Sequence, residues 1–279
     1  MTEAARIESV GFVYPDGTRA LADVDLTLHE GERIGIVGQN GSGKSTLVRQ
    51  LNGLLRPTEG HVALFGRETT GVHVAELART VGLAFQNPDR QIFAGNVRTE
   101  VAFGARNLGR RGAELDRAVQ AALAAVGLDG EMATNPYDLG YSRRKLLALA
   151  SILAMETPVV VLDEPTTGQD ARGVERIQRI VADLGAAGRT VVTISHDMRF
   201  VAESFERVIV MRAGRVILDG PPATVFAAAH ADALASTFLE APLAARLGER
   251  LGLGTTPTEG SLLDALATLE ASAGRPGPG

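Results

Sequence analysis

Residues 33–45, Arg-Ile-Gly-Ile-Val-Gly-Gln-Asn-Gly-Ser-Gly-Lys-Ser, decide the fold of this chain. A short apolar strand, Arg33–Val37, runs directly into a glycine-rich loop, and a helical pattern follows over Ser45–Leu54. Residues 38–45 match the phosphate-binding pattern GxxxxGK[ST] in full, and a strand before and a helix after it are the context that this loop requires. The sequence therefore predicts a nucleotide-binding α/β domain.

The residue types in this loop suit a nucleotide and magnesium. Glycines let backbone N–H groups curl around phosphate oxygens, and the start of the following helix adds a partial positive charge. We expect Lys44 to pair with the β- and γ-phosphates, Ser45 to bind Mg²⁺ and Thr46 to bond the α-phosphate. A glycine turn with a chance lysine is the alternative, which the flanking strand and helix disfavour. The predicted nucleotide-binding residues are Gly38, Asn40, Gly41, Ser42, Gly43, Lys44, Ser45 and Thr46.

Two further strand ends carry polar residues. Asp163 and Glu164 follow the apolar run Val159–Leu162, and His196 follows the buried strand 190–194. A carboxylate beside the phosphate strand can hold Mg²⁺, and the next one can polarise an attacking water. We therefore assign Asp163 to the metal, Glu164 to the water and His196 to the γ-phosphate. Solvent-facing acids and a surface histidine are the alternatives.

Strands alternate with helices along most of the chain. Residues 158–162 and 190–194 read as buried strands, and 113–126, 143–155 and 173–184 as helices. This alternation predicts a parallel sheet flanked by helices. Segments 6–14, 23–28 and 61–65 also read as strands, 207–211 and 215–218 as a hairpin, and the Ala/Leu-rich part after about residue 221 as helical.

The composition narrows the function classes. A net charge of −5 and 4% aromatic residues without Trp disfavour nucleic acid as a partner, and the lack of cysteine excludes disulfides, thiolate zinc sites and a thiol nucleophile. We expect no secretory signal. The longest apolar stretch, Leu146–Met155, is too short to span a bilayer, so any membrane role requires a partner.

Residues 6–220 resemble the ATPase subunits of ABC transporters. The motifs that carry this resemblance occur in the family's order: the phosphate loop, Gln86 in Phe85–Pro88, Asp163–Thr166, a loop that ends at Asp170, and His196. The resemblance implies a RecA-like P-loop core with a mixed sheet, an antiparallel β subdomain and a helical subdomain at about 87–155. It places the ATPase domain at 1–220, a helical extension with a possible dimerisation role at 221–270, and a disordered tail at 271–279.

Within that family, Gln86–Phe93 and Glu100–Gly104 resemble the energy-coupling factor group, whose members energise importers of vitamins and transition-metal ions. Tyr14 would then stack on adenine. Gln86 would contact the metal, the γ-phosphate or the attacking water, and Asp170 would join a dimer contact. The alternatives for Tyr14 and Gln86 are a core-packed aromatic and an ordinary loop residue.

The resemblance also implies ATP hydrolysis with ATP and Mg²⁺, at the cytoplasmic face of the membrane as a peripheral subunit. The implied partners are a second ATPase subunit, a transmembrane coupling subunit and a substrate-binding membrane subunit. An ATPase of another permease type, such as an exporter, is the main alternative. A soluble ABC ATPase and a non-catalytic regulatory subunit fit less well.

One segment departs from the family pattern Leu-Ser-Gly-Gly-Gln. Residues 139–143, here called the signature segment, read Leu-Gly-Tyr-Ser-Arg. In the family this segment acts across the dimer, where it binds the γ-phosphate held by the other subunit. Gly140 removes a hydroxyl donor and Tyr141 adds bulk, whereas Ser142, Arg143 and the helix N-terminus are still able to face phosphate. We favour a heterodimer whose other subunit has an intact signature. A homodimer with two atypical sites and silent variation are the alternatives.

Overall fold

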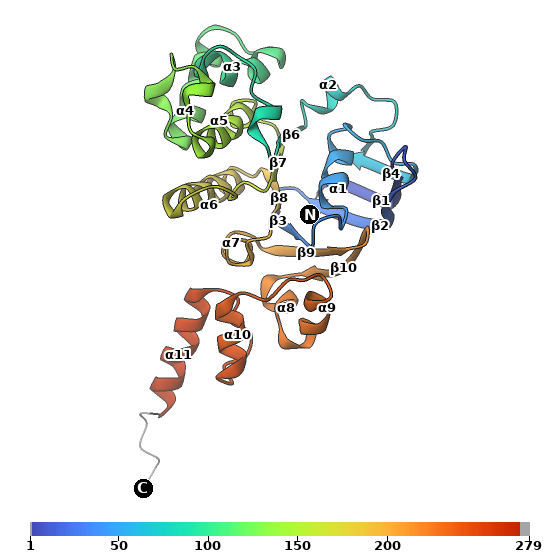
Figure 1. Ribbon diagram of the computed structural model, residues 1–279, viewed down its shortest axis with the longest axis vertical. Coiled ribbons are helices and arrows are strands. Elements are labelled where there is room, and N and C mark those ends of the chain that lie inside the picture. Colours follow the sequence, from blue (N-terminus) through green and yellow to red (C-terminus); the bar gives the residue numbers. More distant parts are fainter. Residues whose placement is uncertain (1, 274–279) are drawn as a thin grey trace.

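The computed structural model describes residues 2–273 of the chain, and a six-stranded sheet runs through its centre (Figure 1). The strands lie in the order β10-β9-β3-β8-β7-β6, and all neighbours are parallel except the hairpin β9–β10. Their bounds are β3 Arg33–Val37, β6 Val81–Ala84, β7 Val159–Asp163, β8 Thr190–Ile194, β9 Arg207–Arg212 and β10 Arg215–Gly220.

The register of the central sheet positions the site. Ile194 of β8 pairs with Ile36 of β3 on one side and with Asp163 of β7 on the other. The carboxyl ends of these three strands therefore meet at one edge of the sheet. β7 and β8 are wholly buried, which explains why they read as continuous apolar runs rather than as alternating patterns.

A second, antiparallel sheet packs beside the first and has the order β2-β1-β4-β5. Its strands are β1 Glu3–Val13, β2 Arg19–His29, β4 Glu59–Leu64 and β5 Arg67–Glu68. Helix α1, Lys44–Leu51, shares one apolar core with this sheet and with β3, and the short helix α2, Val74–Leu77, adds Leu77 to it. The glycine-rich loop thus lies where the two sheets meet.

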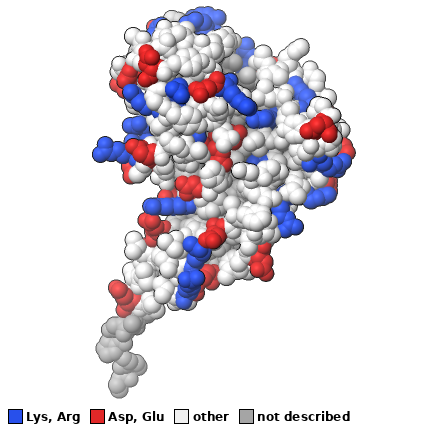
Figure 2. Space-filling model, in the orientation of Figure 1, with Lys and Arg blue, Asp and Glu red and all other residues white. Residues whose placement is uncertain are grey.

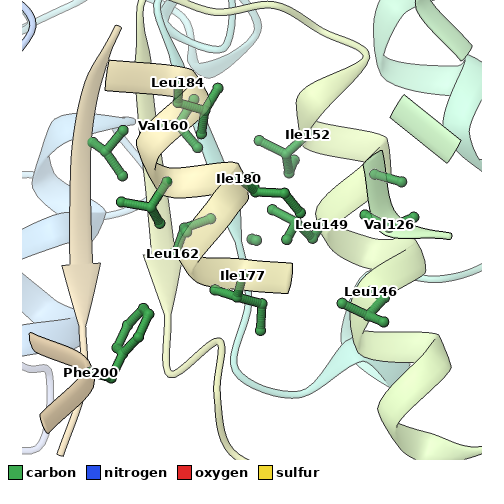
Figure 3. Close-up of a cluster of buried hydrophobic side chains, with 14 of the residues drawn as sticks. Val126, Leu146, Leu149, Ile152, Val160, Leu162, Ile177, Ile180, Leu184 and Phe200 are labelled. Carbon is green, nitrogen blue, oxygen red and sulfur yellow. The ribbon is translucent and has the colours of Figure 1, made fainter. Parts of the chain in front are cut away.

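Helices α3 Val97–Asn107, α4 Gly112–Val126 and α5 Tyr141–Leu153 form a separate cluster, drawn in green in Figure 1. Figure 3 shows how α5 is joined to the sheet: Leu146, Leu149 and Ile152 of α5 face the side chains of β7 and of α6, Ala171–Ala186. Because α5 packs against β6 and its apolar side chains meet those of β7, the start of α5 is held near the functional edge. The 3₁₀ turns of this region are η1 Pro88–Arg90, η2 Asp129–Glu131 and η3 Pro136–Asp138.

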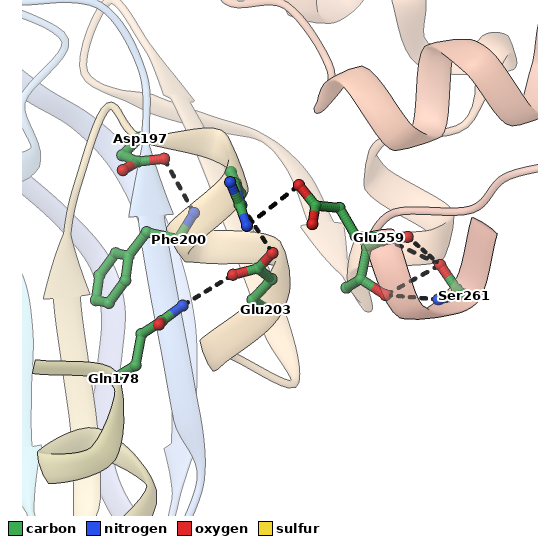
Figure 4. Close-up of polar contacts among 8 residues, drawn as sticks. Gln178, Asp197, Phe200, Glu203, Glu259 and Ser261 are labelled. Carbon is green, nitrogen blue, oxygen red and sulfur yellow. Dashed lines mark hydrogen bonds and ion pairs between the residues drawn. The ribbon is translucent and has the colours of Figure 1, made fainter. Parts of the chain in front are cut away.

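The C-terminal part is helical and continues below the central sheet in Figure 1. It comprises α8 Pro222–Val225, η4 Ala228–His230, α9 Ala231–Ala235, α10 Leu243–Arg250 and α11 Glu259–Ala273. Figure 4 shows its polar link to α7, Met198–Ser204: Arg199 lies 2.9 Å from Glu203 and 3.1 Å from Glu259 of α11. An exposed pair of this kind adds little stability by itself, and the start of α11 is capped locally, where the Ser261 amide donates to the Thr258 hydroxyl at 3.1 Å.

Most predicted elements are present with shifted ends. β2 begins at Arg19 rather than residue 23, α1 ends at Leu51 rather than Leu54, and α5 begins at Tyr141 rather than residue 143. The tail predicted to be disordered from Ala271 is helical through Ala273, and its remaining residues 274–279 lie outside the described part of the chain. β5, β6, α2 and α7 are absent from the prediction because such short elements carry no periodicity.

The surface carries charges of both signs. On the face shown in Figure 2, Lys and Arg side chains are interspersed with Asp and Glu rather than gathered into one stripe. No helix within residues 2–273 is both long and apolar enough to cross a bilayer.

Candidate nucleotide site

The loop between β3 and α1 forms one wall of a pocket of about 300 Å³. Lys44 is buried there, and its ammonium donates to the carbonyl oxygens of Gly38 at 2.6 Å and Gln39 at 2.9 Å. Burial lowers the pKa of Lys44, and the carboxylates of Glu164 and Asp163 oppose that shift. A cation that is paired only with dipoles of its own loop is well placed to exchange them for phosphate oxygens.

The first turn of α1 is open at its N-terminus. Gly43 is the N-cap, no side chain caps the helix, and the first turn contains no acidic residue. Gly43 has φ of +103°, and a Cβ atom there would lie 2.5 Å from the backbone oxygen of Ala20, so only glycine fits without strain. The free N–H groups and the helix dipole therefore point at the pocket and favour an anion.

Asp163 ends β7 at the same pocket and is almost fully buried. Burial raises the pKa of Asp163, while the hydroxyl of Ser45 donates to it and partly offsets the shift. Its Oδ1 atom has no hydrogen-bond partner within the described residues. A buried carboxylate with a vacant oxygen beside a serine hydroxyl is a donor set that suits a hard divalent cation.

Glu164 has an unusual backbone conformation, with φ of +52°. Its amide donates to the carbonyl oxygen of Ile194 at 2.9 Å, and its carboxylate lies in the pocket. His196 Nδ1 approaches Glu164 Oε2 to 2.8 Å, but the geometry is not that of a hydrogen bond and Oε2 is left without such a partner within residues 2–273. The His196 side chain is 60% exposed, so its other nitrogen is free to meet a ligand.

Most of the predicted site residues line this pocket together. Tyr14 does so from the end of β1, where its hydroxyl lies 3.0 Å from that of Thr46 and its ring meets Phe12 edge-to-face. The described residues contain no cluster of three or more acidic or histidine side chains that could hold a metal by themselves. The residues around the pocket are Tyr14, Thr18, Arg19, Ala20, Asn40, Gly41, Ser42, Gly43, Lys44, Ser45, Thr46, Gln86, Asp163, Glu164 and Ile194.

Gln86 lies between two cavities. Besides the nucleotide pocket, it lines a neighbouring cavity of about 530 Å³ that is bounded by Arg49, Leu54, Leu55, Phe85, Asn87 and Arg90. Gln86 itself is exposed and follows β6. Gln86 therefore lines both cavities.

The signature segment and Asp170 lie away from the pocket of their own chain. Gly140 is the N-cap of α5 and makes no side-chain cap, so that helix N-terminus is open as predicted. The Ser142 hydroxyl donates to Gln169 Oε1 at 2.8 Å, and Arg143 pairs with Glu131 at 2.7 Å. The Ser142 hydroxyl is thus used within the chain, whereas Arg143 is exposed and its bond to Glu131 occupies one of its three guanidinium nitrogens. Asp170 caps α6 by accepting from the Gly173 amide at 2.7 Å.

Two residues of this region are not among the predicted site residues. Arg19 lines the pocket and pairs with Glu59, 40 positions away, at 2.8 Å, which no local pattern indicates. Lys145 is buried in α5 and donates to the carbonyl oxygen of Glu164. The signal for Lys145 is a lysine at the head of the apolar run Leu146–Ala150.

Comparisons with known proteins identify the family. The family described as ABC transporter matches residues 21–167, which is more than half of the chain. This chain belongs to the ABC transporter family. It is 42% identical over 251 residues to the energy-coupling factor transporter ATP-binding protein EcfA2 of Symbiobacterium thermophilum, which covers 88% of this chain and 86% of that protein. The resemblance to the energy-coupling factor group is thereby confirmed.

Solved structures of the family confirm the fold. CbiO1 of Clostridium perfringens, part of the ABC transporter complex CbiONQ, matches with a TM-score of 0.75 at 32% identity, over 90% of this chain and all of that one. A dimeric ATP-binding cassette in a post-hydrolysis state with ADP and inorganic phosphate matches with a TM-score of 0.72 at 27% identity, over 78% of this chain and 98% of that one. The chain spans only 43% and 39% of the length of two further relatives, both putative ABC transporter ATP-binding proteins.

Proposed function

We propose that this chain hydrolyses ATP as one ATPase subunit of an energy-coupling factor type importer of a vitamin or transition-metal ion. The observation that carries this proposal is the convergence of Lys44, Asp163 and Glu164 on one pocket over the open N-terminus of α1. Two of these three side chains keep a carboxylate oxygen without a hydrogen-bond partner in the described chain. A buried oxygen without a hydrogen-bond partner costs free energy unless a ligand supplies that partner.

The chain's own residues have distinct tasks in this reaction. Lys44 leaves the carbonyls of Gly38 and Gln39 and takes up phosphate oxygens instead. Glu164 orients a water and accepts its proton. The Nδ1 contact of His196 with Glu164 leaves Nε2 to stabilise charge that develops on the γ-phosphate. Tyr14, at the rim, is proposed to pack against the adenine.

Magnesium fits the residues beside the phosphate loop. Ser45 and Asp163 are the proposed ligands, with Gln86 at the open side of the pocket. When bound, Mg²⁺ neutralises charge on the β- and γ-phosphates. A single buried carboxylate suits this ion, because Mg²⁺ is commonly held by one or two carboxylates together with substrate phosphates and water.

We propose that the chain works as half of a dimer, and we favour a heterodimer. One solved relative is described as a dimeric cassette with ADP and inorganic phosphate. The hydroxyl of Ser142 and the guanidinium of Arg143 are already used within the chain. The serine hydroxyl of this segment is therefore not free for a nucleotide held by the other subunit, which favours a partner whose own signature segment completes this chain's pocket.

The cavity beside Gln86 is the proposed contact for a transmembrane subunit. It is mixed in character, with Leu54, Leu55 and Phe85 beside Arg49 and Arg90, and it shares Gln86 with the nucleotide pocket. A helix seated there would register nucleotide state through Gln86. The proposed location is the cytoplasmic face of the membrane, as a peripheral subunit with a transmembrane coupling protein and a substrate-binding membrane protein.

Purification from the native membrane tests this function. An affinity-tagged chain is isolated in mild detergent, its partners are identified by mass spectrometry, and Mg²⁺-dependent ATP turnover is measured. We expect a second ATPase subunit, a transmembrane subunit and a small membrane protein in the complex. The matched control is a chain with Gln86→Ala, which is expected to keep ATP binding but lose stimulation of turnover by the membrane subunits. Isolation with an exporter-type permease, or with no membrane protein, contradicts the proposal.

A further inference from the structure

Lys145 holds a position that the mechanism above leaves unexplained. Lys44 and Lys145 are the only lysines in the sequence, whereas every other basic side chain of the 28 is arginine. Lys145 lies in the second turn of α5, is 6% exposed and belongs to a helix whose other buried side chains are mostly apolar. A buried ammonium is costly unless it is well paired, so its partners matter.

Its partners are two carbonyl oxygens of the catalytic loop. The Lys145 ammonium donates to the backbone oxygen of Glu164, and to that of Thr167 at 3.0 Å. Both contacts reach from the helical cluster to the loop that follows β7. Burial lowers the pKa of Lys145 to about 8, while the nearby carboxylates of Glu164 and Asp163, both at the end of β7, oppose that shift.

Glu164 is a residue that needs such support. Its φ of +52° lies in the left-handed region, which costs free energy for any residue with a side chain. Pro165 follows it and disfavours the right-handed helical alternative. The amide end of Glu164 is fixed by the carbonyl of Ile194, whereas its carbonyl end otherwise receives only a long bond of 3.4 Å from the Thr167 amide. The Lys145 ammonium is therefore the strong anchor at that end.

We propose that Lys145 is a positioning residue for Glu164: by binding the Glu164 carbonyl it holds the left-handed backbone that aims the Glu164 carboxylate into the nucleotide pocket. This inference rests on the proposed ATPase function. Lys145 does not touch the nucleotide, and it acts on hydrolysis only through Glu164.

A second set of contacts joins the same two segments. Gln169 Nε2 donates to the backbone oxygen of Ser142 at 3.1 Å while the Ser142 hydroxyl donates to Gln169 Oε1, and the Tyr141 ring stands against Gly168. The first two turns of α5 are thus tied to residues 164–169 at both ends of that loop. A displacement of α5 would consequently move the Glu164 peptide, which connects the signature segment to the chain's own catalytic carboxylate.

The test combines Lys145→Met with Lys145→Arg, Glu164→Gln and the double variant Lys145→Met/Glu164→Gln in the full chain. Binding of a non-hydrolysable ATP analogue with Mg²⁺ and single-turnover hydrolysis are measured on each. Lys145→Met keeps a side chain of similar length but leaves the carbonyl oxygens of Glu164 and Thr167 without the ammonium, so some loss of stability is expected and circular dichroism verifies the fold. Ser151→Ala is the matched control, since Ser151 is a buried polar residue of the same helix that bonds only to Leu147.

We expect Lys145→Met to lower the hydrolysis rate by about 10- to 100-fold, because the Glu164 backbone can then relax from its left-handed conformation and move the carboxylate. Affinity for the analogue should be nearly unchanged. Lys145→Arg should recover part of the rate, and Ser151→Ala should behave as wild type. In the double variant, loss of Lys145 should add less than about 3-fold to the effect of Glu164→Gln, because both changes act on one group.

Two results overturn the proposal. One is a wild-type hydrolysis rate in Lys145→Met. The other is full multiplication of the two losses in the double variant, which would mean that Lys145 does not act through Glu164. If Lys145→Met does not fold, Lys145→Arg takes its place in both comparisons. Its hydrolysis rate is then compared with that of wild type, and the double variant Lys145→Arg/Glu164→Gln with Glu164→Gln alone. Failure of the ATPase assignment is distinct, because Glu164→Gln alone would then hydrolyse ATP at the wild-type rate or the analogue would not bind.

Discussion

The nucleotide pocket and the signature segment are two parts of one chemical task, yet their side chains are in opposite states. In the pocket, Asp163 and Glu164 each keep an oxygen without a hydrogen-bond partner in the described chain, and Lys44 donates to oxygen atoms of its own loop. In the signature segment, Ser142 and Arg143 are bound to Gln169 and Glu131. One region offers unfilled capacity to a ligand, whereas the other has already bonded its serine hydroxyl and one Arg143 nitrogen within the fold.

This difference indicates an unequal division of labour. A site that must capture and cleave a triphosphate needs groups whose partners arrive with the substrate, because such groups gain most from binding. A segment whose polar side chains bond within the chain gains stability but gives up donors for a ligand of another subunit. The backbone amides at the start of α5 and the exposed guanidinium of Arg143 are what it can still contribute.

The largest effect is expected from Lys44→Ala. Removing the buried cation deletes the charge-assisted contacts to the β- and γ-phosphates, so ATP affinity should fall on the order of 10³-fold. Titration with a fluorescent ATP analogue measures this, with circular dichroism to verify the fold. Near-normal affinity would mean that ATP binding does not depend on the Lys44 ammonium. The contrast between an available pocket and a bonded signature segment would then be wrong.

Glu164→Gln should retain ATP binding and lose turnover by at least about 10²-fold, in line with general-base contributions. Because ATP then persists at the interface, the variant should accumulate as a dimer with its partner, which size-exclusion chromatography with and without ATP detects. His196→Ala is expected to be less severe, since His196 is more exposed and acts on charge rather than on the water. Wild-type turnover in Glu164→Gln would remove this residue from its proposed role.

Restoring the family pattern in the signature segment tests the second of the two regions. The triple variant Gly140→Ser, Tyr141→Gly, Ser142→Gly returns a hydroxyl donor and removes the Ser142–Gln169 bond. In a dimer formed by this chain alone, turnover should rise by up to about 10²-fold, which is the scale of a regained oxyanion donor. Gln169→Ala, which frees the Ser142 hydroxyl and backbone oxygen but does not restore the family pattern, should change turnover less. Equal turnover in wild type and triple variant would show that the altered signature segment is silent.

The smallest effect concerns the protonation of Lys145. With ¹³C at lysine Cε alone, NMR resolves Lys44 and Lys145, and Lys145→Arg assigns them. The ammonium of Lys145 should titrate at a pKa of about 8, below its ordinary value of 10.5. Between these values the unfolded chain binds more protons than the folded chain, so the contribution of Lys145 to the free energy of unfolding rises with pH. Urea unfolding across that window should show this rise in wild type and a smaller rise in Lys145→Arg, in which only Lys44 still has a lysine pKa lowered by burial.

The pocket could be predicted from the sequence because its chemistry lies in contiguous stretches. Gly38–Ser45 is proposed to bind phosphate through its own backbone, and Asp163 and Glu164 stand at the end of a strand whose apolar run is visible in the sequence. Parallel pairing of β3, β8 and β7 then brings these stretches together by topology alone. The fold class follows from the same alternation of strands and helices.

The contacts of α5 could not be predicted in this way. Lys145 meets Glu164 across 19 positions, and Ser142 meets Gln169 across 27, so these pairs exist only once α5 has packed on β7. Ser142 and Arg143 read as available donors in the sequence because nothing local indicates Gln169 or Glu131 as their partners. The short strand β6 and the exact ends of the C-terminal helices were likewise set by tertiary packing rather than by periodicity.

A crystal structure of the Glu164→Gln variant grown with Mg²⁺ and ATP tests the central claim most directly. We predict the triphosphate over the N-terminus of α1, with the Lys44 ammonium moved from the carbonyls of Gly38 and Gln39 to phosphate oxygens, and with magnesium bound by Ser45 and Asp163. A nucleotide bound elsewhere, or a Lys44 that keeps its carbonyl partners while ATP is present, would contradict the account.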